Sequence, residues 1–425
     1  MSSDRQVKHV TCLGCGCGCD DVTVTIRDGR IAAADPTCPL GAAWFGSGEV
    51  PLEVLHRGEP TSLERAISAA AAELVGAHGR CLVYLGLDLT SEAQRAGLAI
   101  ADLLRAVVDV STSETAANGV LTAQRRGRAG ATLGEIRNRA DTLLFWGVDP
   151  AQRYPRFLER YAVQPTGTHV PDGRRGRTVI GVSVGADRAV TEADLHIEIA
   201  PEQEIEALSL MRLAVLGRAL PTSSPVLNVA TELANQLTRA RYAVVIHDAE
   251  PTAERRNPLR AEALITLTQA LNGPTRAALC SLRAGHNSVG AESVLTWQTG
   301  FPFAVDYSRG FPRYTPGERG LNRITGGGLH AALLVGSMPR SGIASLADMR
   351  TVVIGPRASQ SAFDPIVAID TGVAGVHESG TAYRMDEVPL RLRPPLEGAR
   401  PATPVLMTLH EVVRRKTAET LGMNP

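Results

Sequence analysis

Short apolar runs of strand length recur along the chain, and amphipathic segments of helix length lie between several of them. Buried strands are predicted where four to six apolar residues stand together, and helices where polar and apolar residues alternate at helical spacing. This β–α–β alternation predicts parallel, doubly wound sheets, whose ligands bind at the carboxyl ends of the strands. The expected strands are 81–86, 142–147, 178–182, 242–247, 331–336, 351–355 and 366–369, and the expected helices are 62–76, 91–106, 202–216 and 406–421.

The N-terminal part has a different pattern. Residues 22–26 alternate in strand fashion, Asp28-Gly29 follows, and Arg30-Ile31 begins a second strand. An Asp-Gly pair between alternating segments is a strong signal for a β-hairpin. We therefore expect a small β domain ahead of the parallel sheets.

Composition restricts the classes of partner and location. The 425 residues contain 44 basic and 44 acidic side chains, so the formal net charge of zero gives no reason to expect a nucleic acid partner. Basic residues gather in 124–128 and 173–177, which we interpret as solvated loops. No apolar stretch approaches the ~18–20 residues needed to span a bilayer. The sequence predicts a soluble cytoplasmic protein of two to three domains.

Four cysteines near the N-terminus, Cys12, Cys15, Cys19 and Cys38, follow the spacing C-x2-C-x3-C-x18-C. Three close thiolates and one distant thiolate are typical of a [4Fe–4S] cluster, and the intervening glycines let the backbone curl around an inorganic group. A structural zinc site and a site without metal are the alternatives. Disulfides are less favoured, since the chain has seven cysteines and no secretory signal precedes them. The role of a fifth thiol, Cys17, is left open.

Several segments together resemble the B-type chain of formylmethanofuran dehydrogenase, the catalytic iron–sulfur and molybdopterin subunit of that enzyme. The similarity extends over nearly the whole chain. It is carried by the cysteine loop CLGCGCGCDDV, by TLGEIRNRADTLLFWGVDP (132–150), by the run from RAGHNSVGAES to FPRYTPGE (283–318) and by GTAYRMDEVPLRLRPP (380–395).

The resemblance implies a molybdopterin-oxidoreductase-like α/β fold: a small cysteine-rich β domain and two doubly wound parallel-sheet domains, one inserted in the other. It also implies that no C-terminal β-barrel follows and that the chain works with A-, C- and D-type subunits in an obligate complex. The expected bounds are 1–56 for the cysteine-rich domain with return strands near 380–395, 57–165 plus 325–379 for the first α/β domain, 166–324 for the inserted domain and 396–425 for a C-terminal segment.

The chain departs from the family where a cysteine or selenocysteine of a Cys-His-Gly-Pro motif binds molybdenum or tungsten. The corresponding stretch, 113–120, reads SETAANGV and contains neither cysteine nor histidine. Thr115 or Glu114 could supply only an oxygen ligand, whereas a soft sulfur donor suits this metal. The turn at 183–188 also lacks the basic, threonine-rich character that holds the pterin. We therefore expect no molybdopterin with Mo or W.

Arg283 and His286 match a family segment near the active metal, where they would handle carboxylate-like substrates by charge-assisted hydrogen bonds. Without the metal they are vestigial candidates that contact water or a partner chain. Asp194 and His196 are interpreted as residues that orient the backbone. Trp297 and the stretch 301–314 are interpreted as packing and subunit-contact residues.

These observations favour a non-redox scaffold subunit of a formyltransferase/hydrolase complex in tetrahydromethanopterin-linked one-carbon metabolism, inactive by itself. The alternative is an active Mo/W formylmethanofuran dehydrogenase subunit that interconverts CO2 and formate. A third hypothesis keeps the four cysteines as a zinc site that stabilises the N-terminal domain.

Overall fold

The computed structural model describes residues 4–249, 257–318, 328–338 and 343–420. The chain divides into two compact units. Unit 1 contains residues 1–114 and 285–425, and unit 2 is the continuous segment 115–284. Parts of the expected segments, 325–327, 339–342 and 421–425, lie outside the described residues.

Unit 1 begins with a small antiparallel sheet of β1 (Arg5–Val10), β2 (Val22–Arg27) and β3 (Arg30–Asp35), in the order β1-β2-β3. The turn between β2 and β3 holds Asp28 and Gly29 at positive φ, as an Asp-Gly hairpin requires. The predicted hairpin is therefore confirmed. Helix α1 (Pro39–Phe45) follows, with Pro39 in its first turn.

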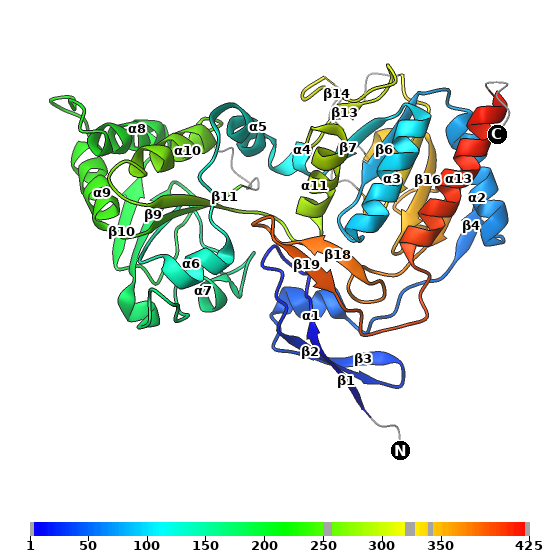
Figure 1. The fold of residues 1–425 in the computed structure, drawn as a ribbon, viewed down its shortest axis with the longest axis horizontal. Helices are drawn as coiled ribbons and strands as arrows, with labels where there is room; N and C mark the ends of the chain where they lie inside the picture. The colour runs from blue at the N-terminus through cyan, green and yellow to red at the C-terminus, as the bar shows by residue number, and fades with distance from the viewer. Residues whose placement is uncertain (1–3, 250–256, 319–327, 339–342, 421–425) are drawn as a thin grey trace. The chain divides into compact units, whose positions relative to one another are not determined.

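The main sheet of unit 1 has parallel strands at its centre and antiparallel pairs at both edges. Helix α13 (Ala402–Thr420) packs against both α2 (Leu63–Val75) and α3 (Ser91–Leu104) beside this sheet (Figure 1). The sheet order is β14 (Arg313–Tyr314), β13 (Val305–Asp306), β7 (Val107–Val110), β6 (Cys81–Leu85), β15 (Ala331–Val335), β16 (Arg350–Gly355), β17 (Val367–Asp370), β4 (Val54–His56) and β5 (Glu59–Pro60).

The remaining elements of unit 1 are α4 (Thr112–Thr115), whose last residue begins unit 2, α11 (Ser288–Thr299), α12 (Ile343–Ala347), and the antiparallel pair β18 (Gly380–Tyr383) and β19 (Pro389–Leu392). This pair returns to the cysteine region, because Ala382 and Leu392 share a small buried core with Leu13. Ser62 caps α2 by accepting a hydrogen bond from the N–H of Arg65, as its place before the apolar pattern predicts.

Unit 2 is built on a parallel sheet in the order β10 (Leu195–Ile199), β9 (Thr178–Val184), β8 (Thr142–Trp146), β11 (Ala243–Asp248) and β12 (Ala277–Leu282). Figure 1 shows α8 (Glu204–Val215) and α10 (Arg260–Leu271) on one side of this sheet, and α6 (Leu133–Arg139) and α7 (Phe157–Arg160) on the other. Helices α5 (Ala117–Arg126) and α9 (Leu227–Arg239) pack against α10 and α8, respectively. The expected α/β fold with parallel sheets and a small antiparallel N-terminal sheet is confirmed.

The division into units does not coincide with the expected boundary at 165/166. Strand β8 pairs with β9 and β11, so the segment from 115 onward belongs to the second sheet. At the other end, β13 pairs with β7 of the first sheet, which places residues after 284 in unit 1. The sequence pattern identified β8, β9 and β11 but neither β7 nor β13, and it carried no information about which strands pair.

In the part of the chain that the structure describes, no helix combines the length and the apolar character needed to cross a membrane.

Candidate functional site

The cysteine loop lies between β1 and β2 in unit 1 and is closed by the N–H of Cys12, which donates to the carbonyl of Cys19 at 2.7 Å. Cys12, Cys15 and Cys19 are buried, and Cys38 is half-buried at the residue that precedes α1. The four thiols are close enough to influence one another. Burial raises the pKa of Cys12 to about 12, and the neighbouring Cys19, Cys15 and Cys38 contribute to this rise.

Cys17, the fifth thiol, is fully buried and hydrogen-bonded to the Cys15 thiol, which raises its pKa well above the usual value. It therefore occupies the interior of the loop together with the predicted ligands. Its role is not assigned by this geometry.

The donor chemistry of the loop suits a thiolate-bound metal or cluster. As placed, however, no group of three or more His, Cys, Asp or Glu side chains in the described residues is arranged to hold a metal ion. The effect of Cys15, Cys19 and Cys38 on the pKa of Cys12 is electrostatic, and such an effect extends over longer distances than a coordination bond. It therefore shows that the thiols are neighbours, but it does not show that they are arranged to bind one metal. The assignment of Cys12, Cys15, Cys19 and Cys38 as metal ligands stays a prediction.

Gly285 and His286 of unit 1 lie against the cysteine loop. The backbone N–H of His286 donates to the carbonyl of Leu13 at 2.7 Å, and its ring meets the ring of Trp44 edge-on at 4.7 Å between centroids. His286 adopts a left-handed backbone conformation, φ 60°. Gly285 approaches the loop so closely that a Cβ atom would lie 2.3 Å from the Cα atom of Cys15.

This close approach predicts a large effect of adding one methyl group. We expect Gly285→Ala to lower the free energy of unfolding by about 1–3 kcal/mol, because the obstacle is backbone and cannot rotate away. Chemical denaturation measures the loss, and metal content per chain provides a second measurement. Gly119→Ala is the matched control: it lies in α5 with open space around it, and there alanine should be neutral or stabilising by about 0.5–1 kcal/mol. Equal stability of the two variants would contradict the proposed packing.

Asn287 is fully buried and joins three segments of unit 1. Its Nδ2 donates to the carbonyl of Leu89 at 3.0 Å, the hydroxyl of Ser91 at 3.1 Å and Oε1 of Gln94 at 3.2 Å. Its Oδ1 accepts from the N–H of Tyr383 at 2.8 Å. Sequence reasoning missed this residue, although it stands directly after His286 in the segment that carries the family resemblance.

Arg283 and His286 lie three positions apart in sequence but belong to different units. Arg283 follows β12 in unit 2 and is buried, with 5% of its surface exposed. His286 belongs to unit 1, in the contacts just described. Arg283 and His286 therefore have different neighbours, and the structure does not place them together in one site.

The stretch 113–120 is occupied by α4 and the start of α5. The hydroxyl of Ser113 donates to Oδ2 of Asp109 at 2.8 Å and to the carbonyl of Val110 at 3.1 Å. The hydroxyl of Thr112 donates to Glu292 at 2.9 Å. Ala116 is buried and presents only a methyl group. Hydrogen bonds of the Ser113 hydroxyl thus attach the stretch to the rest of the protein, and the stretch provides neither a sulfur nor an imidazole ligand.

Buried charged side chains lie at the carboxyl edge of the unit 2 sheet. The chain runs from β8 to one side of the sheet and later returns to the other, so the point between β8 and β11 is where ligands of doubly wound sheets bind. Arg260 donates from Nε to Glu204 and from Nη1 to Asp187, both at 2.5 Å, and Trp146 Nε1 donates to Glu204 at 2.8 Å. We call Arg260, Glu204, Asp187 and Trp146 the unit 2 network.

A second ion pair, between Arg153 and Asp248, lies at the end of β11. The arginines Arg260 and Arg153 are both engaged by carboxylates of their own unit. Among the described residues of this edge, both of these arginines are therefore already paired, and the expected absence of molybdopterin stays a prediction.

The predicted backbone role of Asp194 agrees with its contacts. Its Oδ2 accepts from the N–H of Val179 at 2.8 Å, and it pairs with Arg174 at 2.6 Å, which lowers its pKa. Trp297 is half-exposed and meets the ring of Tyr383 edge-on at 5.7 Å. The subunit-contact role that the sequence suggested for it stays a prediction.

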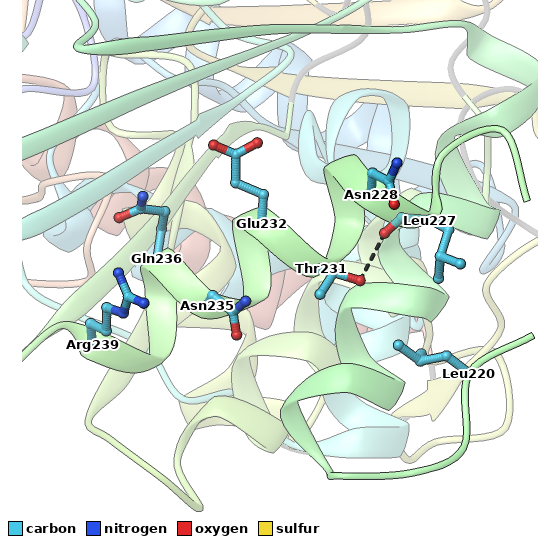
Figure 2. Close-up of a pocket in the computed structure, with 8 residues that line it drawn as sticks. All are labelled: Leu220, Leu227, Asn228, Thr231, Glu232, Asn235, Gln236 and Arg239. Carbon is cyan, nitrogen blue, oxygen red and sulfur yellow. Dashed lines mark hydrogen bonds between the residues drawn. The ribbon is translucent and has the colours of Figure 1, made fainter.

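One hollow in unit 2, of about 450 Å³, is lined almost entirely by α9 (Figure 2). Figure 2 shows Gln236 and Arg239 toward one end of it and Leu220 and Leu227 toward the other. None of the predicted site residues lines this hollow.

The fold and the cysteine loop define an α/β protein with two parallel-sheet units and a thiol-bearing antiparallel sheet. No protein-family model matches the chain. A solved chain of the formyltransferase/hydrolase complex FhcABCD from Methylorubrum extorquens, crystallised with methylofuran, has the same fold, with a TM-score of 0.71 and 23% identity over 87% of this chain and 99% of that one.

Sequence relatives show the family to which the chain belongs. The B-type chain of tungsten-containing formylmethanofuran dehydrogenase 2 is 32% identical in Methanocaldococcus jannaschii, covering 96% of this chain and 99% of that protein. Its counterpart in Methanococcus maripaludis is 30% identical, covering 91% and 93%. The B-type chain of the formyltransferase/hydrolase complex Fhc of M. extorquens is 27% identical, covering 77% and 87%. The chain belongs to the family of B-type formylmethanofuran dehydrogenase subunits, as its motifs predict.

Proposed function

We propose that this chain is the B-type member of a complex that transfers and hydrolyses a formyl group, and that it serves there as a non-redox scaffold. The proposal rests on the absence of a cysteine in the stretch 113–120. Where the family's metal-binding cysteine would stand, Ser113 and Thr112 form hydrogen bonds within unit 1 and Ala116 supplies a buried methyl group. The unit 2 network supports it, because its one cation, Arg260, is already paired with carboxylates.

The proposed chemistry does not need a redox metal. A formyl group that moves from formyl-tetrahydromethanopterin to a furan-type carrier, and is then hydrolysed to formate, keeps the oxidation state of its carbon. The A-, C- and D-type subunits of such a complex would perform these steps, and this chain would hold them together. The relative from M. extorquens is a subunit of a complex with this activity in its name.

We propose a structural role for the cysteine loop. A [4Fe–4S] cluster is favoured by the cysteine spacing and zinc is the alternative, and either would tie the loop to the segment before α1. Electron relay is not part of this proposal, since the stretch 113–120 provides no sulfur ligand for an active metal beyond the loop.

A second candidate function has a specific observation in its favour. The two dehydrogenase subunits match more of this chain, at higher identity, than the Fhc relative does. In that case the chain would bind Mo or W and interconvert CO2 and formate, with oxygen ligands from residues such as Glu114 or Thr115.

Metal analysis of the native complex distinguishes the two functions. We expect no stoichiometric Mo or W, no pterin, formate release from the formylated carrier without an electron acceptor, and no formate-dependent reduction of a viologen dye. Near-stoichiometric Mo or W with bound pterin, together with viologen reduction, would overturn the scaffold proposal. The same preparation tests the cysteine loop. Iron with visible absorption that dithionite bleaches indicates a cluster, colourless protein with bound zinc indicates a zinc site, and metal-free protein contradicts both.

A further inference from the structure

The basic run 173–177 does not form the solvated loop that its composition suggests. It folds as a short 3-10 helix, η1 (Gly173–Gly176), in unit 2, and its three arginines have different surroundings. Arg174 pairs with Asp194, Arg175 is exposed, and Arg177 is buried with 4% of its surface exposed.

Arg177 carries its charge into the protein without a carboxylate partner. Its guanidinium donates to three backbone carbonyls, those of Ala140, Arg137 and Pro165, the last two at 2.8 Å. Its Nε is buried and has no hydrogen-bond partner among the described residues. Burial lowers the pKa of this guanidinium. A buried charge that contacts no carboxylate directly is costly, so an anion beside it would be stabilising.

A polar cavity of about 330 Å³ lies at this residue, beside the first residues of β8 and β9. Arg175, Arg177 and Arg239 contribute to its lining, together with Thr142 and Thr178. The side chains of Arg175 and Arg239 make neither hydrogen bonds nor ion pairs with any described residue. Three guanidinium groups therefore border one cavity, and two of them are free to contact a ligand.

The one carboxylate in the lining, Asp141, does not cancel this charge. Its oxygens accept from the N–H and Nε of Arg241, at 3.1 and 3.0 Å, and from the N–H of Tyr242 at 3.0 Å. The charge of Asp141 also acts on Arg177. One carboxylate nevertheless faces four arginines, namely Arg175, Arg177, Arg239 and Arg241, so positive charge remains in excess.

We propose that this cavity, the arginine cavity, binds a phosphate group, either as free phosphate or as a phosphate monoester. A planar guanidinium matches the oxygens of phosphate in a two-pronged contact, and a doubly charged anion uses several such groups at once. A single carboxylate would leave most of the positive charge unmatched. Gln236 and Arg239 line both this cavity and the hollow along α9, so the remainder of a monoester would lie toward that hollow.

Titration calorimetry of the full-length chain with inorganic phosphate tests the proposal, with acetate at equal ionic strength as the carboxylate probe. We expect saturable phosphate binding and no saturable acetate binding. Arg175→Gln and Arg239→Gln should each weaken phosphate binding about tenfold, the effect of removing one charge-assisted hydrogen bond. Arg177 is left unchanged because its three carbonyl contacts hold the fold together.

Arg125→Gln is the matched control, since Arg125 is an exposed arginine of α5 in the same unit and does not line the arginine cavity. It should retain the original affinity. Absence of saturable phosphate binding would overturn the proposal, and so would binding that survives the double change of Arg175 and Arg239. Acetate binding as tight as phosphate binding would also overturn it and would indicate a carboxylate occupant.

Discussion

Replacing Arg260 by leucine is expected to lower the free energy of unfolding by about 3–5 kcal/mol, because the change removes a buried cation that pairs with the buried carboxylates of Glu204 and Asp187. The Arg260 side chain is 7% exposed, and those of Glu204 and Asp187 are 1% and 10% exposed. Water therefore cannot replace the lost partner. Urea denaturation followed by circular dichroism measures the effect.

The same unit offers a matched exposed pair. Arg188 and Glu198 lie 2.7 Å apart with side chains that are 65% and 80% exposed, so Arg188→Leu should cost less than about 1 kcal/mol. Adding Glu204→Gln to Arg260→Leu should recover part of the loss, because one uncompensated charge is removed. Equal losses for Arg260→Leu and Arg188→Leu would show that the unit 2 network does not stabilise the fold.

Asn287→Leu is expected to cost about 4 kcal/mol in unit 1. The substitution preserves approximate size but removes the amide contacts with Leu89, Ser91, Gln94 and Tyr383. Each buried polar group left without a partner costs about 1–3 kcal/mol. Denaturation gives the total. Faster amide hydrogen exchange at Tyr383 would show that β18 has lost its attachment to this residue.

Asn235→Leu provides the comparison for this substitution. Asn235 is exposed on α9, so the same chemical change there should stay within about 0.5 kcal/mol. A loss at Asn287 no larger than the loss at Asn235 would contradict the role assigned to Asn287.

The sequence was informative where a structure is encoded locally. The apolar runs identified the central strands, Asp28-Gly29 identified the hairpin, and Ser62 identified the start of α2. These features depend on residues within a few positions of one another, so composition and spacing are sufficient to predict them.

Features that depend on distant partners could not be predicted in this way. Arg260 pairs with carboxylates 56 and 73 positions away, and Asn287 binds Gln94 across 193 positions. The run 173–177 shows the same limit, because nothing in its composition distinguishes the buried Arg177 from the exposed Arg175. Family motifs located the segment 283–318, but the contacts inside it required the fold.

The insertion of unit 2 within unit 1 also sets an order of events during protein synthesis. Strand β6 pairs with β15, whose residues are made about 250 positions later, after all of unit 2. At about 5–20 residues per second, β6 waits roughly 10–50 s on the ribosome for this partner. Unit 2 can be complete in that interval, while the apolar strand Cys81–Leu85 still lacks one of its neighbours. The nascent chain therefore exposes an aggregation-prone edge at a defined stage, and that stage is where a chaperone would bind it.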